Sequence, residues 1–176
     1  MMILGLSFTT FTALHVAISL IGVVSGLVAM SGMLVGKRMA SVTLVFLAST
    51  ALTSLTGLLY PSASFGTRHM VGIASIALLA IACLAAYAYR LAGVWRPVYV
   101  ASALLALYFN TIAAIVQAFQ KIPALAAWAA SGSEPRLLTM QVAVFVLFAV
   151  MGGLAVWGGR REAVGPYHGE RLGGQG

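Results

Sequence analysis

The stretch from Phe8 to Arg38, FTTFTALHVAISLIGVVSGLVAMSGMLVGKR, decides the fold class of this chain. It carries no charged residue until Lys37 and Arg38 close it. A helix of about 20 mostly apolar residues crosses the hydrocarbon core of a bilayer, which is about 30 Å thick. The stretch therefore predicts a first transmembrane helix that ends at this basic pair.

The rest of the chain has the same apolar character. Of its 176 residues, 61% are hydrophobic and 7% are charged, with a mean hydropathy of +1.02, whereas soluble domains carry about 25% charged residues. The net charge of +7 comes from lysines and arginines that stand singly or in pairs between apolar blocks, so no basic face for nucleic acid can form. We therefore expect one membrane domain whose partner is the lipid bilayer, not a nucleic acid.

Five apolar runs are long enough to cross the bilayer, at about residues 8–36, 39–60, 69–89, 97–120 and 137–157. The runs lack the alternation of a membrane β-strand, which favours helices. The segment between the fourth and fifth runs is too short to cross again and predicts a turn or an interfacial helix. The sequence thus predicts an all-α, five-helix transmembrane bundle over residues 1–158, followed by a flexible, glycine-rich cytoplasmic tail over 159–176.

The distribution of basic residues predicts the orientation of the bundle. Assigning the connections alternately to two sides places seven basic residues on one side and three on the other. The seven are Lys37, Arg38, Arg90, Arg96, Arg160, Arg161 and Arg171, and the three are Arg68, Lys121 and Arg136. Because cytoplasmic loops are enriched in Lys and Arg, the N-terminus is expected outside and the C-terminus inside.

Glycines in the first run predict how the helices pack. Gly22 and Gly26 form one GxxxG pair, and Gly32 and Gly36 form a second. Lipid is as apolar as the helices, so helices associate where small residues allow their backbones to approach closely. We expect these glycines to serve packing within one bundle, with a homodimer as the alternative.

Polar residues in the fourth run indicate where a function is located. Asn110, Gln117 and Lys121 stand at positions i, i+7 and i+11, which form one face of a helix. His15 in the first run and Thr53 in the second belong to the same outer half of the bundle. Amides are costly in hydrocarbon unless they are paired, so the stripe should face other helices. We predict either a ligand-binding site made of these five residues, or polar contacts that only fix the helix register, worth about 1 kcal/mol or less each.

Histidines offer a second kind of site in the same half. His15 and His69 both fall on the outer side, and two imidazoles on facing helices can ligate a b-type haem. A quinone that hydrogen-bonds to His15, Asn110 or Gln117 needs no metal. His168 falls on the opposite side and the chain has one cysteine, so we expect no zinc site. The chain has no aspartate, and its three glutamates lie outside the predicted bilayer core, which excludes a Ser-His-Asp triad.

Three segments carry a resemblance to a known group of proteins. They are ALYFNTIAAIVQAFQKIPAL (106–125) followed by SEP (133–135), LHVAISLIGVVSGLV (14–28) and TGLLYP (56–61). In these segments the chain resembles a group of small, uncharacterised integral membrane proteins of proteobacteria. The resemblance covers most of the chain except the tail, and it implies a bacterial inner membrane without implying an activity.

The sequence therefore favours a non-enzymatic binding protein, or an accessory subunit of a larger membrane complex, with a polar site in the periplasmic half of the bundle. The alternative is an electron-transfer protein that binds haem b or quinone near His15 and His69.

Overall fold

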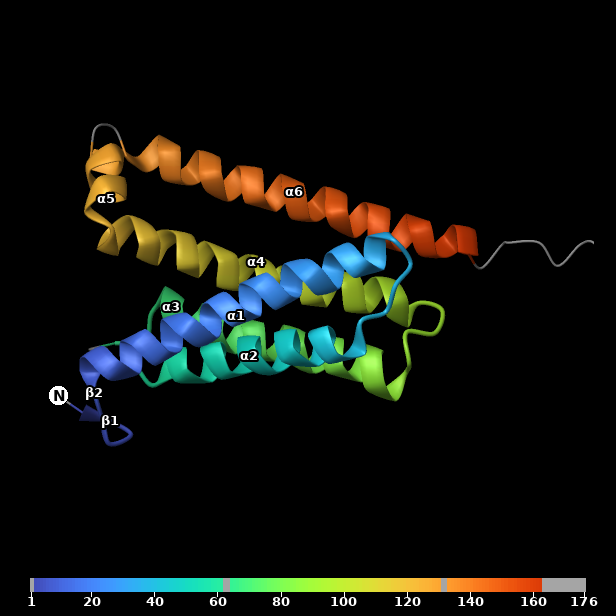
Figure 1. Ribbon diagram of the computed structural model, residues 1–176, viewed down its shortest axis with the longest axis horizontal. Coiled ribbons are helices and arrows are strands. Elements are labelled where there is room, and N and C mark those ends of the chain that lie inside the picture. Colours follow the sequence, from blue (N-terminus) through green and yellow to red (C-terminus); the bar gives the residue numbers. More distant parts are fainter. Residues whose placement is uncertain (1, 62–63, 131–132, 163–176) are drawn as a thin grey trace, which may run out of the picture.

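The computed structural model describes residues 2–61, 64–130 and 133–162, and most of them are helical (Figure 1). The elements in chain order are β1 (Met2–Ile3), β2 (Leu6–Ser7), α1 (Phe8–Leu34), α2 (Ala40–Leu58), α3 (Thr67–Cys83), the π-helical turn η1 (Leu84–Ala88), α4 (Trp95–Lys121), α5 (Pro123–Ala130) and α6 (Ser133–Glu162). Within the described residues, five helices are long and apolar enough to cross a membrane: α1, α2, α3 with η1, α4 and α6. The predicted all-α architecture with five membrane-length helices is confirmed.

The segment after α4, predicted as a turn or an interfacial helix, forms the eight-residue helix α5, which joins α4 to α6 at one end of the bundle (Figure 1). The boundary of the predicted tail differs from the observed one. Helix α6 continues to Glu162, so the first four residues of the predicted tail belong to this helix. The remainder of that tail, residues 163–176, lies outside the described residues.

Local hydrogen bonds at its two ends set the length of α1. The Ser7 hydroxyl accepts a hydrogen bond from the Thr10 backbone N–H at 3.1 Å, which caps the first turn. At the other end, the backbone N–H of Lys37 donates to the Gly32 carbonyl at 2.9 Å, and that of Gly36 donates to the Met33 carbonyl at 3.3 Å. This is a Schellman motif, and Gly36 adopts the positive φ of 72° that the motif requires. The helix therefore stops just before its basic pair.

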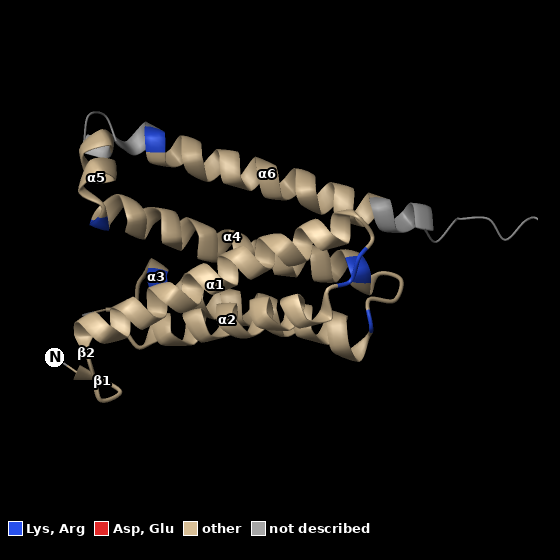
Figure 2. Cartoon of the chain, viewed as in Figure 1, with Lys and Arg blue, Asp and Glu red and all other residues tan. Residues whose placement is uncertain are grey.

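The basic residues separate to the two ends of the bundle (Figure 2). One end, here named the α5 end, holds α5, the N-terminal hairpin, the last turn of α2 and the first turn of α3 (Figure 1). The opposite end holds the α1–α2 and α3–α4 connections. Among the residues drawn in tan or blue, no Lys or Arg lies in the middle of the bundle. This separation is typical of helices whose ends reach the two faces of a bilayer.

Glycines of α1 hold the centre of the bundle together. A Cβ atom built on Gly26 would lie 2.7 Å from Leu107 Cδ1 of α4 and 2.8 Å from Phe46 Cδ2 of α2. A Cβ atom on Gly22 would lie 2.9 Å from Thr50 Oγ1 of α2. The first GxxxG pair is thus used for packing within the chain, as predicted, because it lets α1 contact α2 and α4 closely. The Phe46 and Leu107 side chains that fill this contact are fully buried.

Helix α6 lies along one side of the other helices (Figure 1). It contacts α4 where Gly152 faces Leu104, since a Cβ atom at Gly152 would lie 2.8 Å from Leu104 Cδ1. Most of its large apolar side chains, such as Phe145 and Leu154, are exposed. The packed unit is therefore α1 to α4, with α6 as a peripheral helix.

Substituting Ala for Gly26 tests the packing role of this glycine. We expect Gly26→Ala to lower the free energy of unfolding in detergent micelles by about 1–3 kcal/mol, because the added methyl group meets two fully buried side chains. Gly153→Ala on α6 is the matched control, since a Cβ atom there meets nothing within 4 Å. Equal stability of the two variants would contradict this account of the packing.

Candidate functional site

A cavity of about 730 Å³ lies between α1, α2, α3 and α4 and reaches the α5 end. Helix α4 lines it from Phe109 to Lys121, α3 from Thr67 to Ser75, and α1 and α2 contribute their turns nearest the same end. This volume lies within the range of about 300–1,000 Å³ that is typical of small-molecule sites.

All five residues predicted to form a polar site line this cavity: His15, Thr53, Asn110, Gln117 and Lys121. The structure therefore brings together side chains from three helices that are far apart in the sequence. The cavity also has polar wall residues that the predicted set did not include, namely Thr12, Ser54, Tyr60, Thr67, Arg68, Ser75 and Gln120.

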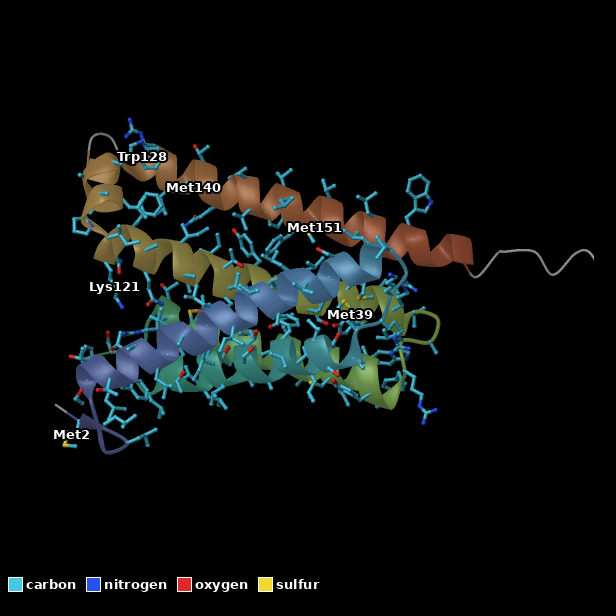
Figure 3. The ribbon with its side chains drawn as sticks, viewed as in Figure 1. Met2, Met39, Lys121, Trp128, Met140 and Met151 are labelled. Carbon is cyan, nitrogen blue, oxygen red and sulfur yellow. The ribbon has the colours of Figure 1, made fainter. Side chains whose placement is uncertain are left out.

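The α4 residues give the direction and depth of the cavity. Asn110 is buried, with 6% of its surface exposed, whereas Lys121 at the last turn of α4 is exposed. The eleven residue steps from Asn110 to Lys121 span about 16 Å at about 1.5 Å per residue, which is roughly half of a ~30 Å hydrocarbon core. The Lys121 side chain extends from the end of α4 toward the α1 and α3 side, away from α5 and α6 (Figure 3). The cavity thus has a buried floor at Asn110 and a basic mouth at Lys121.

Asn110 and Ser19 form a reciprocal pair at the floor. The Ser19 hydroxyl donates to Asn110 Oδ1 at 2.7 Å, and Asn110 Nδ2 donates to the Ser19 carbonyl at 3.2 Å. The missing side chain of Gly22 leaves room for this amide, because a Cβ atom there would lie 3.0 Å from Asn110 Nδ2. The pair joins α1 to α4, and its two hydrogen bonds replace those that the Asn110 amide would make to water.

His15 is held by a second cross-helix hydrogen bond. Its Nδ1 lies 2.7 Å from Thr56 Oγ1, and the Thr56 hydroxyl donates to the Leu52 carbonyl at 2.7 Å. When the Thr56 hydroxyl donates its one proton to the Leu52 carbonyl, the imidazole proton lies on Nδ1 and Nε2 keeps a lone pair. The Tyr60 ring meets the imidazole edge to face, with the ring centroids 5.3 Å apart.

Thr53 behaves differently from the other predicted residues. Its hydroxyl donates to the Ser49 carbonyl of its own helix at 2.9 Å, and the neighbouring Ser54 hydroxyl donates to the Thr50 carbonyl at 3.0 Å. Serine and threonine often satisfy their hydroxyls in this way within apolar helices. These two side chains therefore need no ligand to be stable in the wall.

Cationic side chains from two helices line the mouth. Lys121 Nζ lies 3.5 Å from Gln117 Oε1, a long hydrogen bond within α4. Arg68, in the first turn of α3, is exposed, and within the described part of the chain it makes no hydrogen bond or ion pair. The chain has no aspartate, and none of the side chains that the structure describes is a glutamate. The described wall of the cavity therefore carries positive charge without a neutralising carboxylate.

The structure does not bring His69 into the cavity with His15. His69 Nδ1 accepts a hydrogen bond from the Gly66 backbone N–H at 3.2 Å, and its ring stacks on Phe65 with centroids 5.2 Å apart. These contacts cap the start of α3. Among the described residues, no group of three or more His, Cys, Asp or Glu side chains could hold a metal ion. His168, predicted on the other side of the membrane, lies outside the described residues.

Another hollow, of about 580 Å³, lies between α4 and α6. Its walls come mainly from apolar side chains such as Val100, Leu104 and Phe148. This hollow has few polar groups that could hydrogen-bond to a ligand and fix the ligand's orientation.

No protein-family model, curated protein or solved structure matches the chain. The cavity at the α5 end is therefore the basis for a functional proposal.

A double-mutant cycle tests the pair at the floor of the cavity. We expect Ser19→Ala and Asn110→Ala to be coupled by about 0.6–1.7 kcal/mol in the free energy of unfolding, the usual range for cross-helix hydrogen bonds in membranes. Ser19→Ala combined with Thr111→Val is the control, because the Thr111 hydroxyl bonds to the Leu107 carbonyl of its own helix. Coupling of the same size in both cycles would rule out a specific Ser19–Asn110 pair.

Proposed function

We propose that this chain is an integral protein of the bacterial inner membrane that binds a small molecule in the cavity at the α5 end without acting on it chemically. The observation that carries the proposal is the convergence of His15, Thr53, Asn110, Gln117 and Lys121 on one cavity. Side chains that served only to fix helix register could satisfy each other in scattered pairs, and they would not need to surround a hollow of this size.

The proposed orientation puts the mouth of the cavity on the periplasmic side. More of the Lys and Arg residues in the sequence are assigned to the opposite end than to the α5 end. Because cytoplasmic loops are enriched in Lys and Arg, this distribution supports the proposed orientation. The likeness to small proteobacterial membrane proteins supports the inner membrane as the location. A ligand would then reach the cavity from the periplasm or from the outer leaflet.

An accessory role in a larger complex is compatible with the same cavity. The Ser-His-Asp type of machinery is excluded by composition, since the chain lacks aspartate. In such a role, the chain would present its bound molecule to a partner. Membrane-protein subunits or a second copy of the chain are the partners we propose.

Cavity filling tests the binding proposal. We expect native mass spectrometry of the protein, purified in mild detergent from its own membrane, to detect a bound small molecule. Ala113→Phe should remove that molecule, because Ala113 lines the cavity and the added phenyl ring would take up part of its volume. Ala143→Phe on the exposed face of α6, away from either hollow, should retain it. A ligand-free native protein, or equal loss in both variants, would contradict the proposal.

An absorption spectrum of the same preparation tests the electron-transfer alternative. We expect no Soret band, because His69 caps α3 and does not line the cavity with His15. A Soret band that disappears in His15→Ala or His69→Ala would establish haem and overturn this preference. Quinone would be recognised by its mass in the native spectrum and by a redox-dependent ultraviolet band.

A further inference from the structure

We propose that the ligand of this cavity is an anionic amphiphile, with a carboxylate or phosphate head at the Arg68 and Lys121 mouth and one hydrocarbon chain that extends toward Asn110. This inference rests on the proposed binding function and adds the chemical class of the ligand. It follows from three properties of the wall: where hydrogen-bonding groups are already paired, where the wall is apolar, and where charge is left without a counterion.

The deep polar groups are largely paired within the protein. Both polar atoms of the Asn110 amide bond to Ser19, His15 Nδ1 bonds to Thr56, and the Thr53 hydroxyl bonds to the carbonyl of Ser49. A polar ligand at this depth would lose its hydration and find few vacant partners, which is costly. The floor therefore accepts hydrocarbon better than a sugar, a nucleotide or a peptide.

The middle of the wall is mainly apolar. Between floor and mouth it presents Val71 and Gly72 of α3 and Ile112, Ala113 and Val116 of α4. Gly72 packs on α2, since a Cβ atom there would lie 2.9 Å from Leu58 Cδ2. A methylene chain gains about 25 cal/mol per Å² of surface when it leaves water for such a wall.

The mouth supplies charge that the described part of the chain does not neutralise. Among the described residues, Arg68 forms no ion pair, and Lys121 makes only the long hydrogen bond to Gln117 Oε1. Arginine binds carboxylates and phosphates through two parallel N–H donors, and lysine adds a point charge. Both residues stand at helix ends, at the level where a membrane protein meets lipid headgroups. A carboxylate or phosphate head at this level would neutralise the charges of Arg68 and Lys121.

The dimensions favour one hydrocarbon chain. The floor lies about 16 Å below Lys121 along α4, which is roughly the depth of one leaflet. The volume of about 730 Å³ is that of a site for one small molecule. A fatty acid, or a phosphate ester with one chain, fits this shape with its head at the mouth. A diacyl phospholipid would have to leave a chain outside the cavity.

Native mass spectrometry with matched probes tests the charge of the head. The probes are palmitate, methyl palmitate, hexadecyl phosphate and dipalmitoyl phosphatidylglycerol, each titrated into protein freed of co-purified lipid. We expect palmitate or hexadecyl phosphate to bind at least about tenfold more tightly than methyl palmitate, the equivalent of one charge-assisted contact. The tighter of the two acids identifies a carboxylate or a phosphate head.

Variants at the mouth locate the head. Arg68→Gln and Lys121→Gln should each weaken binding of the preferred acid about tenfold and leave methyl palmitate unchanged. Arg136→Gln is the matched control, because Arg136 belongs to the same end but its guanidinium lies over the Trp128 ring, 4.9 Å from the centroid, and does not line the cavity. Arg68→Lys should restore part of the affinity, and unchanged thermal unfolding would show that the exposed substitutions leave the fold intact.

Two results would overturn the inference, and they differ from failure of the proposed function. If methyl palmitate binds as tightly as palmitate and the mouth variants change nothing, the cavity binds a ligand but not through an anionic head. If phosphatidylglycerol binds more tightly than both single-chain acids, the single-chain assignment is wrong. If no probe binds and the native protein carries no small molecule, the binding function itself is wrong.

Discussion

Hydrocarbon offers no hydrogen bonds, and the arrangement of α1 to α4 follows from this constraint. Each polar side chain within the membrane-length helices must find a partner in the protein or face a hollow that water or a ligand can enter. The Ser19–Asn110 pair meets the requirement across α1 and α4, and the His15–Thr56 contact meets it across α1 and α2. The Thr53 and Ser54 hydroxyls meet it within their own helix, whereas Thr50 Oγ1 is buried without a hydrogen-bond partner among the described residues. The two cross-helix contacts fix which faces of α1, α2 and α4 turn toward one another.

The cavity is a consequence of how closely the helices approach at different heights. At Gly26 the backbone of α1 contacts the buried Phe46 and Leu107 side chains without a gap. From this contact toward the α5 end, α4 separates from α1 (Figure 1). The space between them is bordered by apolar residues in its middle and by polar or basic residues at its floor and mouth, whereas apolar side chains pack α1 to α4 together in the opposite half. Within α1 to α4, one half is therefore closely packed and the other leaves room for a ligand.

Hydropathy and charge were sufficient to predict the five helices, because bilayer thickness sets their length and basic residues mark their ends. The polar face of α4 was also predictable, since it depends only on helical periodicity. The hydrogen-bond partners of this face could not be predicted from the sequence. Ser19 bonds to Asn110, and Thr56 to His15, only because tertiary packing sets the rotation and crossing of the helices. In the sequence, nothing distinguishes Arg68 from an ordinary charge at the membrane interface. Only the packing of α3 beside α4 brings it to the cavity. The capping role of His69 depends on its hydrogen bond from the Gly66 backbone N–H, a role usually filled by Glu or Gln at that position, so the sequence carries no strong signal for it.

Cysteine labelling provides the most direct measurement of whether the polar face of α4 borders an open cavity. In a Cys83→Ala background, which removes the single native cysteine, Gln117→Cys and Ile115→Cys would be treated in intact cells with a membrane-impermeant maleimide. Gln117 lines the cavity, whereas Ile115, on the opposite face of the same helix, does not. We predict rapid labelling at position 117 from the periplasm and little at position 115. Equal labelling at both positions, or labelling at 117 only after the cells are opened, would contradict an outward-facing polar cavity.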